Sequence, residues 1–571
     1  MDNETKYNRT AGITMTSLKK VKLPLEQAYR WEKAKADDIY LTQPMGNGVV
    51  QEYTWNRAIG EARRMASYLK SLNYPPKSRI GILSKNCAHW IMTDLAIWMA
   101  GHVTVPLYPT LNSDTVNYIL KHSDAELLFV GKLDDWEDMK SGVPADLPCV
   151  SYPLSPKTDF PSWDNIVAEN APMQEDTVRD PEELATIVYT SGSTGQPKGV
   201  MLSFYSMGVA ASGVAQALDI NPSDRMLSYL PLAHVFERYA VEQSSIHIGA
   251  QLFFADALDT FLDDLRRAKP TVFISVPRLW SKFQMGIFKK MPPKKLNRLL
   301  KIPIISGLVK KKVLTALGLE YCRFAGSGSA PLSEDIINWY RNLGLELLEG
   351  YGMSENFAYS HISMPGRSKV GYVGEPLPGV EQRISEIGEI EVKSPATMMG
   401  YYKDEEKTKE SFTEDGFLLT GDKGEIDAAG RLKITGRIKE MFKTSKGKYV
   451  APAPIENKII GHDAIEMVCV SGADCPQPHA LLMLSDETFA QHGDAGFRKD
   501  LEPSLLELMK EVNDSVDPHE QLQFMVVVKD QWLIENDFLT PTMKIKRNII
   551  EDVYKPLQDQ WYGAKQKIIW Q

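Results

Sequence analysis

Helical and β-type patterns of apolar residues alternate along the chain from about residue 50. Residues 53–72 carry apolar side chains at helical spacing, and the short apolar run at 79–84 has the length and composition of a strand. A second helical stretch over 89–101 precedes strand-like runs at 103–108 and 126–131. Strands that alternate with helices predict mostly parallel sheets covered by helices.

The same alternation resumes between residues 225 and 276. After about residue 370 short β-type pieces are separated by glycine turns, which predicts a small, mainly antiparallel subdomain. A chain of 571 residues is too long for one core. We therefore expect an α/β fold with an N-terminal domain over 1–437, which includes a β-rich subdomain at about 370–437. A small, mobile α+β C-terminal domain is expected over 438–571.

Composition and charge argue against several classes of protein. The 24% of charged residues is typical of a globular protein, and the net charge of −9 argues against general nucleic-acid binding. The most apolar window, residues 90–108, is interrupted by Asp94, His102 and Pro106, which predicts a buried helix and a strand instead of a membrane span. The first residues lack a signal-peptide pattern, and five scattered cysteines are typical of a reducing cytoplasm.

A loop rich in glycines and hydroxyl groups follows the apolar run at 185–189. Backbone N–H groups beside glycines can surround an anion, and hydroxyls and a lysine can bind phosphate oxygens. The order differs from a Walker A loop, in which the lysine follows the last glycine. The alternative is a flexible linker, but a linker rarely starts directly from a buried strand. The predicted polyphosphate site comprises Thr190, Ser191, Gly192, Ser193, Thr194, Gly195 and Lys198.

The loop YTSGSTGQPKGV resembles the signature loop of the adenylate-forming superfamily, which includes acyl-CoA synthetases, adenylation domains and luciferases. Five further motifs follow in the family's order: GSGSAPL at 326, GYGMSE at 350, LTGDKGEID at 419, GRIKEMFKTSKGKYVAPAPIE at 436 and LTPTMKIKR at 539. The resemblance implies a reaction in two steps. A carboxylate attacks the α-phosphate of ATP and expels pyrophosphate, and a thiol, usually that of coenzyme A, then displaces AMP.

Several matching positions are nucleotide contacts in that family. Tyr351 would pack against adenine, Asp422 would accept hydrogen bonds from the ribose hydroxyls, and Arg437 would make a second ribose or phosphate contact. Glu355 and Thr190 would bind Mg²⁺. The other expected nucleotide contacts are Gly328, Gly352 and Ser354. Taken alone, Glu355 and Asp422 could be turn carboxylates, and Arg437 an ordinary surface arginine.

Lys544 matches the family's mobile lysine, which bridges the reacting carboxylate and the α-phosphate. Many members have glycine before it, whereas this chain has Met543, which is closer to the long-chain fatty acyl branch. In a strand Lys546 would share a face with Lys544, so the resemblance, not the spacing, selects Lys544. Lys439 matches the hinge residue about which the family's C-terminal domain swings. The residues expected near coenzyme A are Lys446, Gly447 and Lys448, for which a charged hairpin loop is the alternative.

The segment YLPLAHVFER at 229–238 also resembles the long-chain branch, where it lines the acyl pocket, as does VPRLWSK at 276–282. His234 is therefore a candidate catalytic residue with Lys198 and Lys544, although it could equally be a core histidine. Together the matches imply a fatty acyl-CoA synthetase for medium to long chains that uses ATP, Mg²⁺ and coenzyme A. A fatty acyl-AMP ligase, an acyl–acyl carrier protein synthetase and an inactive nucleotide sensor at the membrane are the alternatives.

A basic run is visible without reference to any family. Residues 281–312 contain ten Lys or Arg and no Asp or Glu, interleaved with bulky apolar residues. This combination suits the surface of an anionic membrane. The alternatives are a solvated basic face and a nucleic-acid patch, for which the interleaved aromatic residues are few. We expect a cytoplasmic protein that contacts the inner face of a membrane through this run.

Overall fold

The computed structural model describes residues 21–190, 196–540 and 543–571, and the chain forms two compact units. The second unit comprises residues 331–336, 383–391 and 420–571. The first unit comprises the remaining described residues up to 419. Each unit has sheets of its own and is described by itself.

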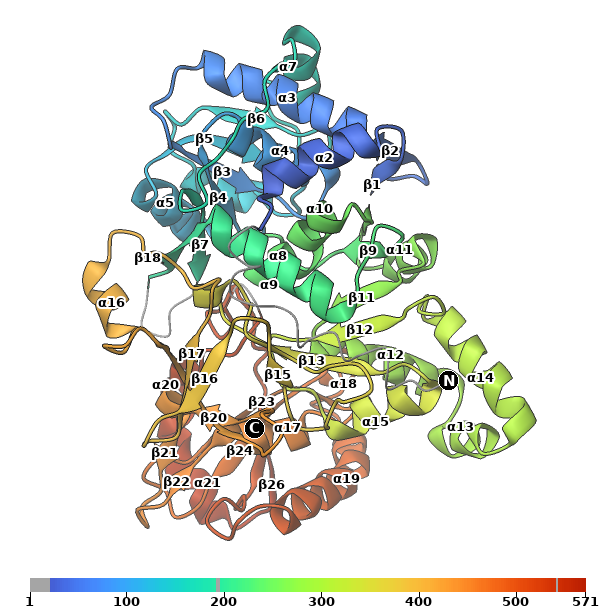
Figure 1. Ribbon diagram of the computed structural model, residues 1–571. Helices are drawn as coiled ribbons and strands as arrows, with labels where there is room; N and C mark the ends of the chain where they lie inside the picture. The colour runs from blue at the N-terminus through green and yellow to red at the C-terminus, as the bar shows by residue number, and fades with distance from the viewer. Residues whose placement is uncertain (1–20, 191–195, 541–542) are drawn as a thin grey trace. The chain divides into compact units, whose positions relative to one another are not determined.

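The largest sheet of the first unit has seven strands in the order β18-β8-β7-β4-β3-β5-β6 (Figure 1). Their bounds are β3 (Arg79–Leu83), β4 (Val103–Leu107), β5 (Ala125–Val130), β6 (Cys149–Ser151), β7 (Leu184–Thr190), β8 (Lys198–Ser203) and β18 (Gly400–Tyr401). The strands from β7 to β6 are parallel, while β8 is antiparallel to β7 and β18 antiparallel to β8. The central strands are buried along most of their length, as expected for a sheet that helices cover on both faces.

Two further sheets belong mainly to the first unit. One has the order β2-β1-β10-β9, with β1, β10 and β9 parallel, and the other the order β11-β12-β13-β14-β15, with β11, β12 and β13 parallel. Their bounds are β1 (Ile39–Pro44), β2 (Val50–Thr54), β9 (Arg225–Ser228), β10 (Gln251–Phe254), β11 (Val272–Ser275), β12 (Phe324–Ser327), β13 (Leu347–Tyr351), β14 (His361–Ile362) and β15 (Glu375–Pro376).

Helices of this part of the chain alternate with the strands, as the sequence predicts. Their bounds are α2 (Pro24–Ala34), α3 (Trp55–Ser71), α4 (Ala88–Met99), α5 (Ser113–His122), α6 (Trp136–Met139), α7 (Trp163–Glu169), α8 (Phe204–Leu218), α9 (Val235–Glu237), α10 (Ser244–Ile248), α11 (Phe261–Ala268), α12 (Pro277–Lys290), α13 (Pro293–Leu300), α14 (Pro303–Ala316), α15 (Glu334–Leu343) and α16 (Glu405–Glu410). The helix and strand expected within 90–108 are confirmed, since every residue of α4 is buried and β4 follows.

A buried ion cluster lies between α4 and the chain that follows α9. The Arg238 guanidinium forms ion pairs with Asp94 and with Glu242, and all three side chains are 0% exposed. Its Nη1 also donates a hydrogen bond to Thr186 Oγ1 on β7, at 2.7 Å. Burial raises the pKa of Asp94 and of Glu242, and the charge of Arg238 opposes that rise. Asp94, which interrupts the apolar window in the sequence, is thus paired inside the core.

The second unit contains most of a four-stranded sheet of order β16-β17-β19-β20, a two-stranded sheet β21-β22, and a four-stranded sheet of order β23-β24-β25-β26. The strands are β16 (Glu381–Ile384), β17 (Glu389–Lys393), β19 (Leu418–Ile426), β20 (Leu432–Arg437), β21 (Phe442–Lys443), β22 (Tyr449–Val450), β23 (Ile465–Ser471), β24 (His479–Leu484), β25 (Met525–Val527) and β26 (Ile568–Trp570). The helices are α17 (Pro452–Ile459), α18 (Asp486–Phe489), α19 (Ala495–Asp514), α20 (Arg547–Tyr554) and α21 (Gln558–Ala564).

The predicted fold class is confirmed: parallel sheets with helices, a small β-rich region and a separate α+β C-terminal part. The domain bounds 1–437 and 438–571 stay a prediction. In the described part of the chain, no helix combines the length and the hydropathy that a bilayer crossing needs. All five cysteines are free thiols.

Candidate active site

The predicted phosphate loop is bounded by two paired strands of the first unit. β7 and β8 are antiparallel, and Thr190 at the end of β7 lies opposite Lys198 at the start of β8. The hairpin therefore holds the two ends of the loop side by side. Five of the predicted contacts lie outside the described residues: Ser191, Gly192, Ser193, Thr194 and Gly195.

A tyrosine that the sequence analysis missed connects Lys198 with Glu355. The Lys198 ammonium lies 5.7 Å from the ring centroid of Tyr401, and the Tyr401 hydroxyl donates a hydrogen bond of 2.7 Å to Glu355 Oε1. Burial raises the pKa of Tyr401 and the charge of Glu355 raises it further, so the hydroxyl stays protonated and donates. The sequence GYYKD has no motif that marks this tyrosine. It reaches the site because β18 pairs with β8.

Glu355 lies in a short 3₁₀ helix, Ser354–Asn356, just after β13. Its backbone carbonyl accepts a hydrogen bond from the N–H of Met398 at 2.7 Å. The turn needs glycine at 352, since a Cβ there would lie 2.5 Å from the carbonyl carbon of Ala358. Carboxylate Oε2 accepts no hydrogen bond from any described residue, so one oxygen remains for a cation.

A single carboxylate fits Mg²⁺ that arrives with a nucleotide, because this ion is usually bound by one or two carboxylates together with phosphates and water. Within residues 21–190, 196–540 and 543–571 no group of three or more His, Cys, Asp or Glu could hold a metal by itself. The donor set around Glu355 therefore suits a metal carried by polyphosphate and not a cage made by the protein alone.

His234 and Gly328 are brought together by Phe236. His234 caps α9, and its Nδ1 accepts a hydrogen bond from the N–H of Phe236 at 3.1 Å. The Phe236 ring covers the backbone at Gly328, where a Cβ would lie 2.9 Å from the ring. The histidine is half-buried, and its ring centroid lies 6.4 Å from that of Tyr108. This geometry fits a catalytic histidine and equally a core histidine, so the role of His234 stays a prediction.

Tyr351 ends β13 opposite His361 on β14. The two ring centroids are 6.0 Å apart. Both ring nitrogens of His361 are hydrogen-bonded, to Ser360 Oγ and to Gln382 Oε1, at 2.8 Å each. Burial lowers the pKa of His361 to about 4, so this imidazole is neutral near pH 7. It lies beside the Tyr351 ring without adding a charge.

In the second unit, β19 and β20 bring Asp422 and Arg437 face to face. The two residues are direct partners in the antiparallel register, and Arg437 Nε donates to Asp422 Oδ1 at 2.9 Å. Asp422 is buried, and its N–H donates to Thr420 Oγ1 at 3.1 Å. An acidic side chain held in this way can accept hydrogen bonds from vicinal hydroxyls, as in dinucleotide-binding folds.

The candidate lysine Lys544 lies in a tight turn and not in a strand. Its N–H donates to Thr540 Oγ1 at 3.1 Å, and its carbonyl accepts from the N–H of Thr540 at 2.8 Å. Only an isolated bridge joins Leu539 and Ile545. Met543 has a φ of 60°, in the left-handed region that favours glycine, which explains why many family members have glycine here. Lys546 differs from Lys544 because it forms an ion pair with Asp537.

The electrostatic surroundings of Lys544 include both of the predicted ribose contacts. Its pKa is lowered, first because surrounding protein restricts the solvation of the ammonium group and second because Arg437 is positively charged. The carboxylates of Asp422 and Glu440 act in the opposite direction. The second unit thus places the candidate lysine within electrostatic range of Asp422 and Arg437, although more than a hundred residues separate them in the sequence.

Lys439 lies in the short 3₁₀ helix Ile438–Glu440, directly after β20. The predicted coenzyme A contacts form the tip of the β21–β22 hairpin, where Gly447 has a φ of 77°. The N–H of Thr444 donates to the carbonyl of Lys448 at 2.9 Å, which closes the turn. Lys446 and Lys448 are exposed on it. This arrangement suits a mobile polyanionic partner and equally a solvated charged hairpin.

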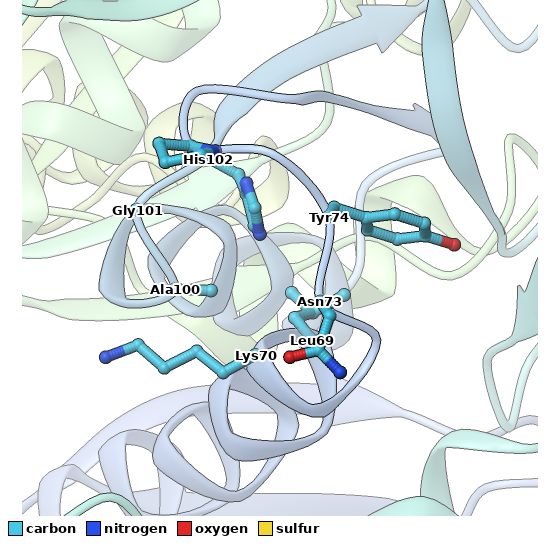
Figure 2. A pocket seen from close by; sticks show the side chains of 8 residues that line it. Leu69, Lys70, Asn73, Tyr74, Ala100, Gly101 and His102 are labelled. Carbon is cyan, nitrogen blue, oxygen red and sulfur yellow. The ribbon is translucent and has the colours of Figure 1, made fainter.

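A separate pocket of about 270 Å³ lies at the C-terminal ends of α3 and α4 (Figure 2). Its lining residues are Leu69, Lys70, Asn73, Tyr74, Pro76, Ala100, Gly101 and His102. Burial lowers the pKa of His102 to about 4, helped by the charges of Arg179 and Lys70, so its imidazole is neutral. None of the predicted site residues lines this pocket.

Two family models together match most of the chain. The family described as AMP-binding enzyme matches residues 28–402, and the AMP-binding enzyme C-terminal domain matches 440–566. The chain is 31% identical to Long-chain-fatty-acid--CoA ligase FadD15 of Mycobacterium tuberculosis, over 90% of this chain and 93% of that protein. It is 30% identical to human Long-chain-fatty-acid--CoA ligase 1, over 87% of this chain and 80% of that protein.

Solved structures at lower identity share the fold. The anthranilate CoA ligase AuaEII, in complex with anthranoyl-AMP, has a TM-score of 0.76 at 21% identity and covers 94% of this chain and 98% of its own. The adenylation domain of a carboxylate reductase from Mycobacterium chelonae has a TM-score of 0.79 at 20% identity, over 95% of this chain and 91% of its own. At these identities the likeness concerns the fold alone.

Proposed function

This chain belongs to the AMP-binding enzyme family, in the long-chain acyl-CoA synthetase branch of the adenylate-forming superfamily, and we propose that it converts a medium- to long-chain fatty acid to its coenzyme A thioester. The observation that carries the proposal is the chain of contacts from Lys198 through Tyr401 to Glu355, at the end of the hairpin that bounds the phosphate loop. A cation, a hydrogen-bond donor and a carboxylate there suit a bound polyphosphate and its metal.

In the proposed first step a carboxylate oxygen of the fatty acid bonds to the α-phosphorus of ATP, and the bond to the β-phosphate oxygen breaks. Lys198, Thr190 and the hydroxyls of the adjoining loop would hold the departing pyrophosphate. Lys544 would donate to the carboxylate and to the α-phosphate oxygens, where negative charge accumulates. Tyr351 would pack on the adenine, and Asp422 with Arg437 would hold the ribose. In the second step the thiolate of coenzyme A attacks the acyl carbon and AMP leaves.

Mg²⁺, when bound, neutralises phosphate charge and orients the β- and γ-phosphates. Glu355 would hold it through the oxygen that does not bond to Tyr401, with Thr190 as the other candidate ligand. The Tyr401 hydroxyl would fix the carboxylate in one orientation. The Lys198 ammonium, beside the same tyrosine ring, would complete the charge balance around the phosphates.

The C-terminal domain, residues 438–571, is proposed to move between the two steps about Lys439. The hairpin tip with Lys446, Gly447 and Lys448 would then approach coenzyme A. Two positively charged, exposed side chains on a short turn can reach a phosphorylated ligand without distorting the fold. Such movement assembles two different sites in turn and is not itself a source of chemical acceleration.

The proposal is tested by pyrophosphate release from Mg·ATP with fatty acids from C2 to C20, each with and without coenzyme A. Sustained turnover that peaks on a medium or long chain and requires coenzyme A supports it, and omission of Mg²⁺ should abolish turnover. A single burst without coenzyme A turnover would indicate an acyl-AMP ligase or a carrier-protein acceptor. No release with any acid would favour the inactive nucleotide-sensing relative.

We further propose that this enzyme works in the cytoplasm and contacts the inner face of an anionic membrane through residues 281–312. α13 and α14, which pack against each other, carry most of this run (Figure 1). On α14 only Val313 is buried, while Ile304 and Leu308 are 88% and 71% exposed. The same stretch carries these exposed basic residues: Lys294, Lys295, Arg298, Lys301, Lys311 and Lys312. Exposed apolar residues and exposed cations on the same pair of helices suit a surface of acidic lipid.

Reversing the charge of Lys310, Lys311 and Lys312 to Glu should weaken binding to phosphatidylserine-containing vesicles more than about a hundredfold, since each lysine near such a surface contributes about 1 kcal/mol. Flotation at low and high salt measures this binding, and binding of the wild type should fall as salt rises.

The double variant Ile304→Asp, Leu308→Asp should also lose binding. Val178→Asp, at a residue that is 85% exposed outside this run, is the matched control. Wild-type protein that fails to float at low salt would overturn the proposal.

A further inference from the structure

The segment that joins β9 to α9, residues 229–234, has no regular secondary structure of its own. It follows the carboxyl end of a parallel strand, where ligands usually bind in open α/β sheets. It also leads to His234 and Phe236, which lie in the segment that the resemblance to the long-chain branch places beside the acyl chain of the substrate. Because no ladder of strand hydrogen bonds holds this segment, its position depends on side chains from elsewhere.

Asn86 makes two hydrogen bonds to the segment and a third to Ser228, the residue before it. This residue belongs to the loop between β3 and α4, in a different sheet from β9. Its Nδ2 donates to the carbonyl of Leu230 at 2.6 Å and to Ser228 Oγ at 2.7 Å, and its Oδ1 accepts from the N–H of Leu232 at 3.1 Å. The side chain is 6% exposed, so these bonds are shielded from water. The amide of Asn86 therefore holds the carbonyl of Leu230 and the N–H of Leu232, two residues further along the segment.

Glu237, the last residue of α9, closes the same network from the other end. Its Oε1 accepts from Ser228 Oγ at 2.7 Å, from the N–H of Tyr229 at 3.0 Å and from Asn86 Nδ2 at 3.4 Å. The residue is 1% exposed, and its Oε2 has no hydrogen-bond partner among the described residues. Burial raises the pKa of Glu237 to about 8, so the carboxyl group is largely uncharged at neutral pH. An uncharged hydrogen-bond acceptor at this position is therefore sufficient to hold the segment.

The opposite side of the segment rests on β11 and β12. The Tyr229 hydroxyl donates to Ser275 Oγ at 2.6 Å, and the N–H of Gly328 donates to the carbonyl of Ser275 at 3.3 Å. The Phe236 ring covers Gly328. A shift of the segment would therefore move Phe236 and His234 relative to the ends of these strands.

We infer that Asn86 and Glu237 are positioning residues that fix segment 229–236 as a rigid wall of the acyl pocket and thereby set chain-length selectivity. This inference rests on the proposed function. An enzyme can discriminate between fatty acids that differ by one methylene by about 10- to 200-fold at best. This discrimination requires a pocket wall that does not move when a longer acid binds. The two side chains act through the segment and do not themselves touch the substrate.

The test uses the full-length protein, with kcat and KM measured for a series of fatty acids and for ATP. Asn86→Ala and Glu237→Ala should raise KM for the preferred acid about tenfold and flatten the chain-length profile, while KM for ATP stays within about twofold. Glu237→Gln keeps an oxygen acceptor in place and should restore the wild-type profile. Ser228→Ala, which removes only one hydroxyl from the network, is the milder variant if the alanine variants fold poorly.

Asp224→Asn is the matched control, because this buried carboxylate lies just before β9, at the other end of the strand from Ser228. It accepts from the N–H of Asn221 at 2.9 Å, from Thr271 Oγ1 at 2.6 Å and from Arg323 Nε at 2.9 Å. It should lower thermal stability without changing selectivity. An unchanged chain-length profile in the Asn86 and Glu237 variants, or an equal rise of both KM values, would overturn the inference. A wild-type protein inactive with every acid would instead overturn the proposed function.

Discussion

Replacement of Lys544 by alanine should slow adenylation about 10²- to 10³-fold, the usual effect of removing one donor to transition-state charge. Thioester formation from supplied acyl-adenylate and coenzyme A should be much less affected, because the proposed movement of the C-terminal domain takes Lys544 away from the phosphate before that step. The two half-reactions are measured separately, as pyrophosphate release and as acyl-CoA formation. Equal losses in both would refute the assigned role.

Lys546→Ala is the control for this experiment. Lys546 is two residues away and carries the same charge, but it is paired with Asp537. Its loss should leave adenylation within a few-fold of the wild type, since an exposed ion pair contributes only about 0–1 kcal/mol. If both variants lost adenylation equally, the assignment of Lys544 by resemblance would be wrong.

Replacement of Arg238 by methionine should lower the free energy of unfolding by about 3–5 kcal/mol, because it leaves buried carboxylates without their cation. Arg238 is the only cation among the described residues that is ion-paired with Asp94 or with Glu242, and all three side chains are 0% exposed. Denaturant unfolding measures the effect. Arg266→Met, at a 45% exposed arginine paired with the more exposed Asp263, should cost no more than about 1 kcal/mol.

The effect of Arg238→Met should grow as the pH rises. Burial already raises the pKa values of Asp94 and Glu242, and Arg238 opposes that rise, so its removal raises them further. A carboxyl group with a raised pKa in the folded state holds a proton that the unfolded state releases, and stability falls as the pH rises above the ordinary carboxyl range. The variant should therefore be closer to the wild type at pH 5 than at pH 8. A loss of equal size at both values would show that packing, not charge, is responsible.

Apolar patterns within short stretches of sequence are sufficient to predict many of the helices and strands. The helix and strand within residues 90–108 form as expected, because a mostly apolar run long enough for both has to be buried. The strand before the phosphate loop is likewise found at Leu184–Thr190. Asp94 is visible in the sequence as a polar interruption of this run, but only the fold shows that Arg238, far along the chain, forms an ion pair with it.

Other features could not be obtained from local patterns. Tyr401 joins Lys198 to Glu355 because β18 pairs with β8, and no periodicity predicts which distant strands pair. Lys544 and Lys546 looked equivalent under a strand pattern, yet the chain turns at Met543 and only Lys546 forms an ion pair with Asp537. The left-handed φ of Met543 is invisible in a sequence that lacks glycine there.

By itself, the sequence determined the family, the α/β class and the candidate residues of the phosphate, ribose and lysine motifs. Ordered motifs and hydrophobic periods are properties of neighbouring residues, so they can be recognised without knowing the fold. Only the tertiary structure decided which side chains meet: Tyr401 with Glu355, Arg238 with Asp94, and Asn86 with Glu237. Each of these contacts joins residues from different elements, and its distance and shielding from water arise only when sheets and helices pack.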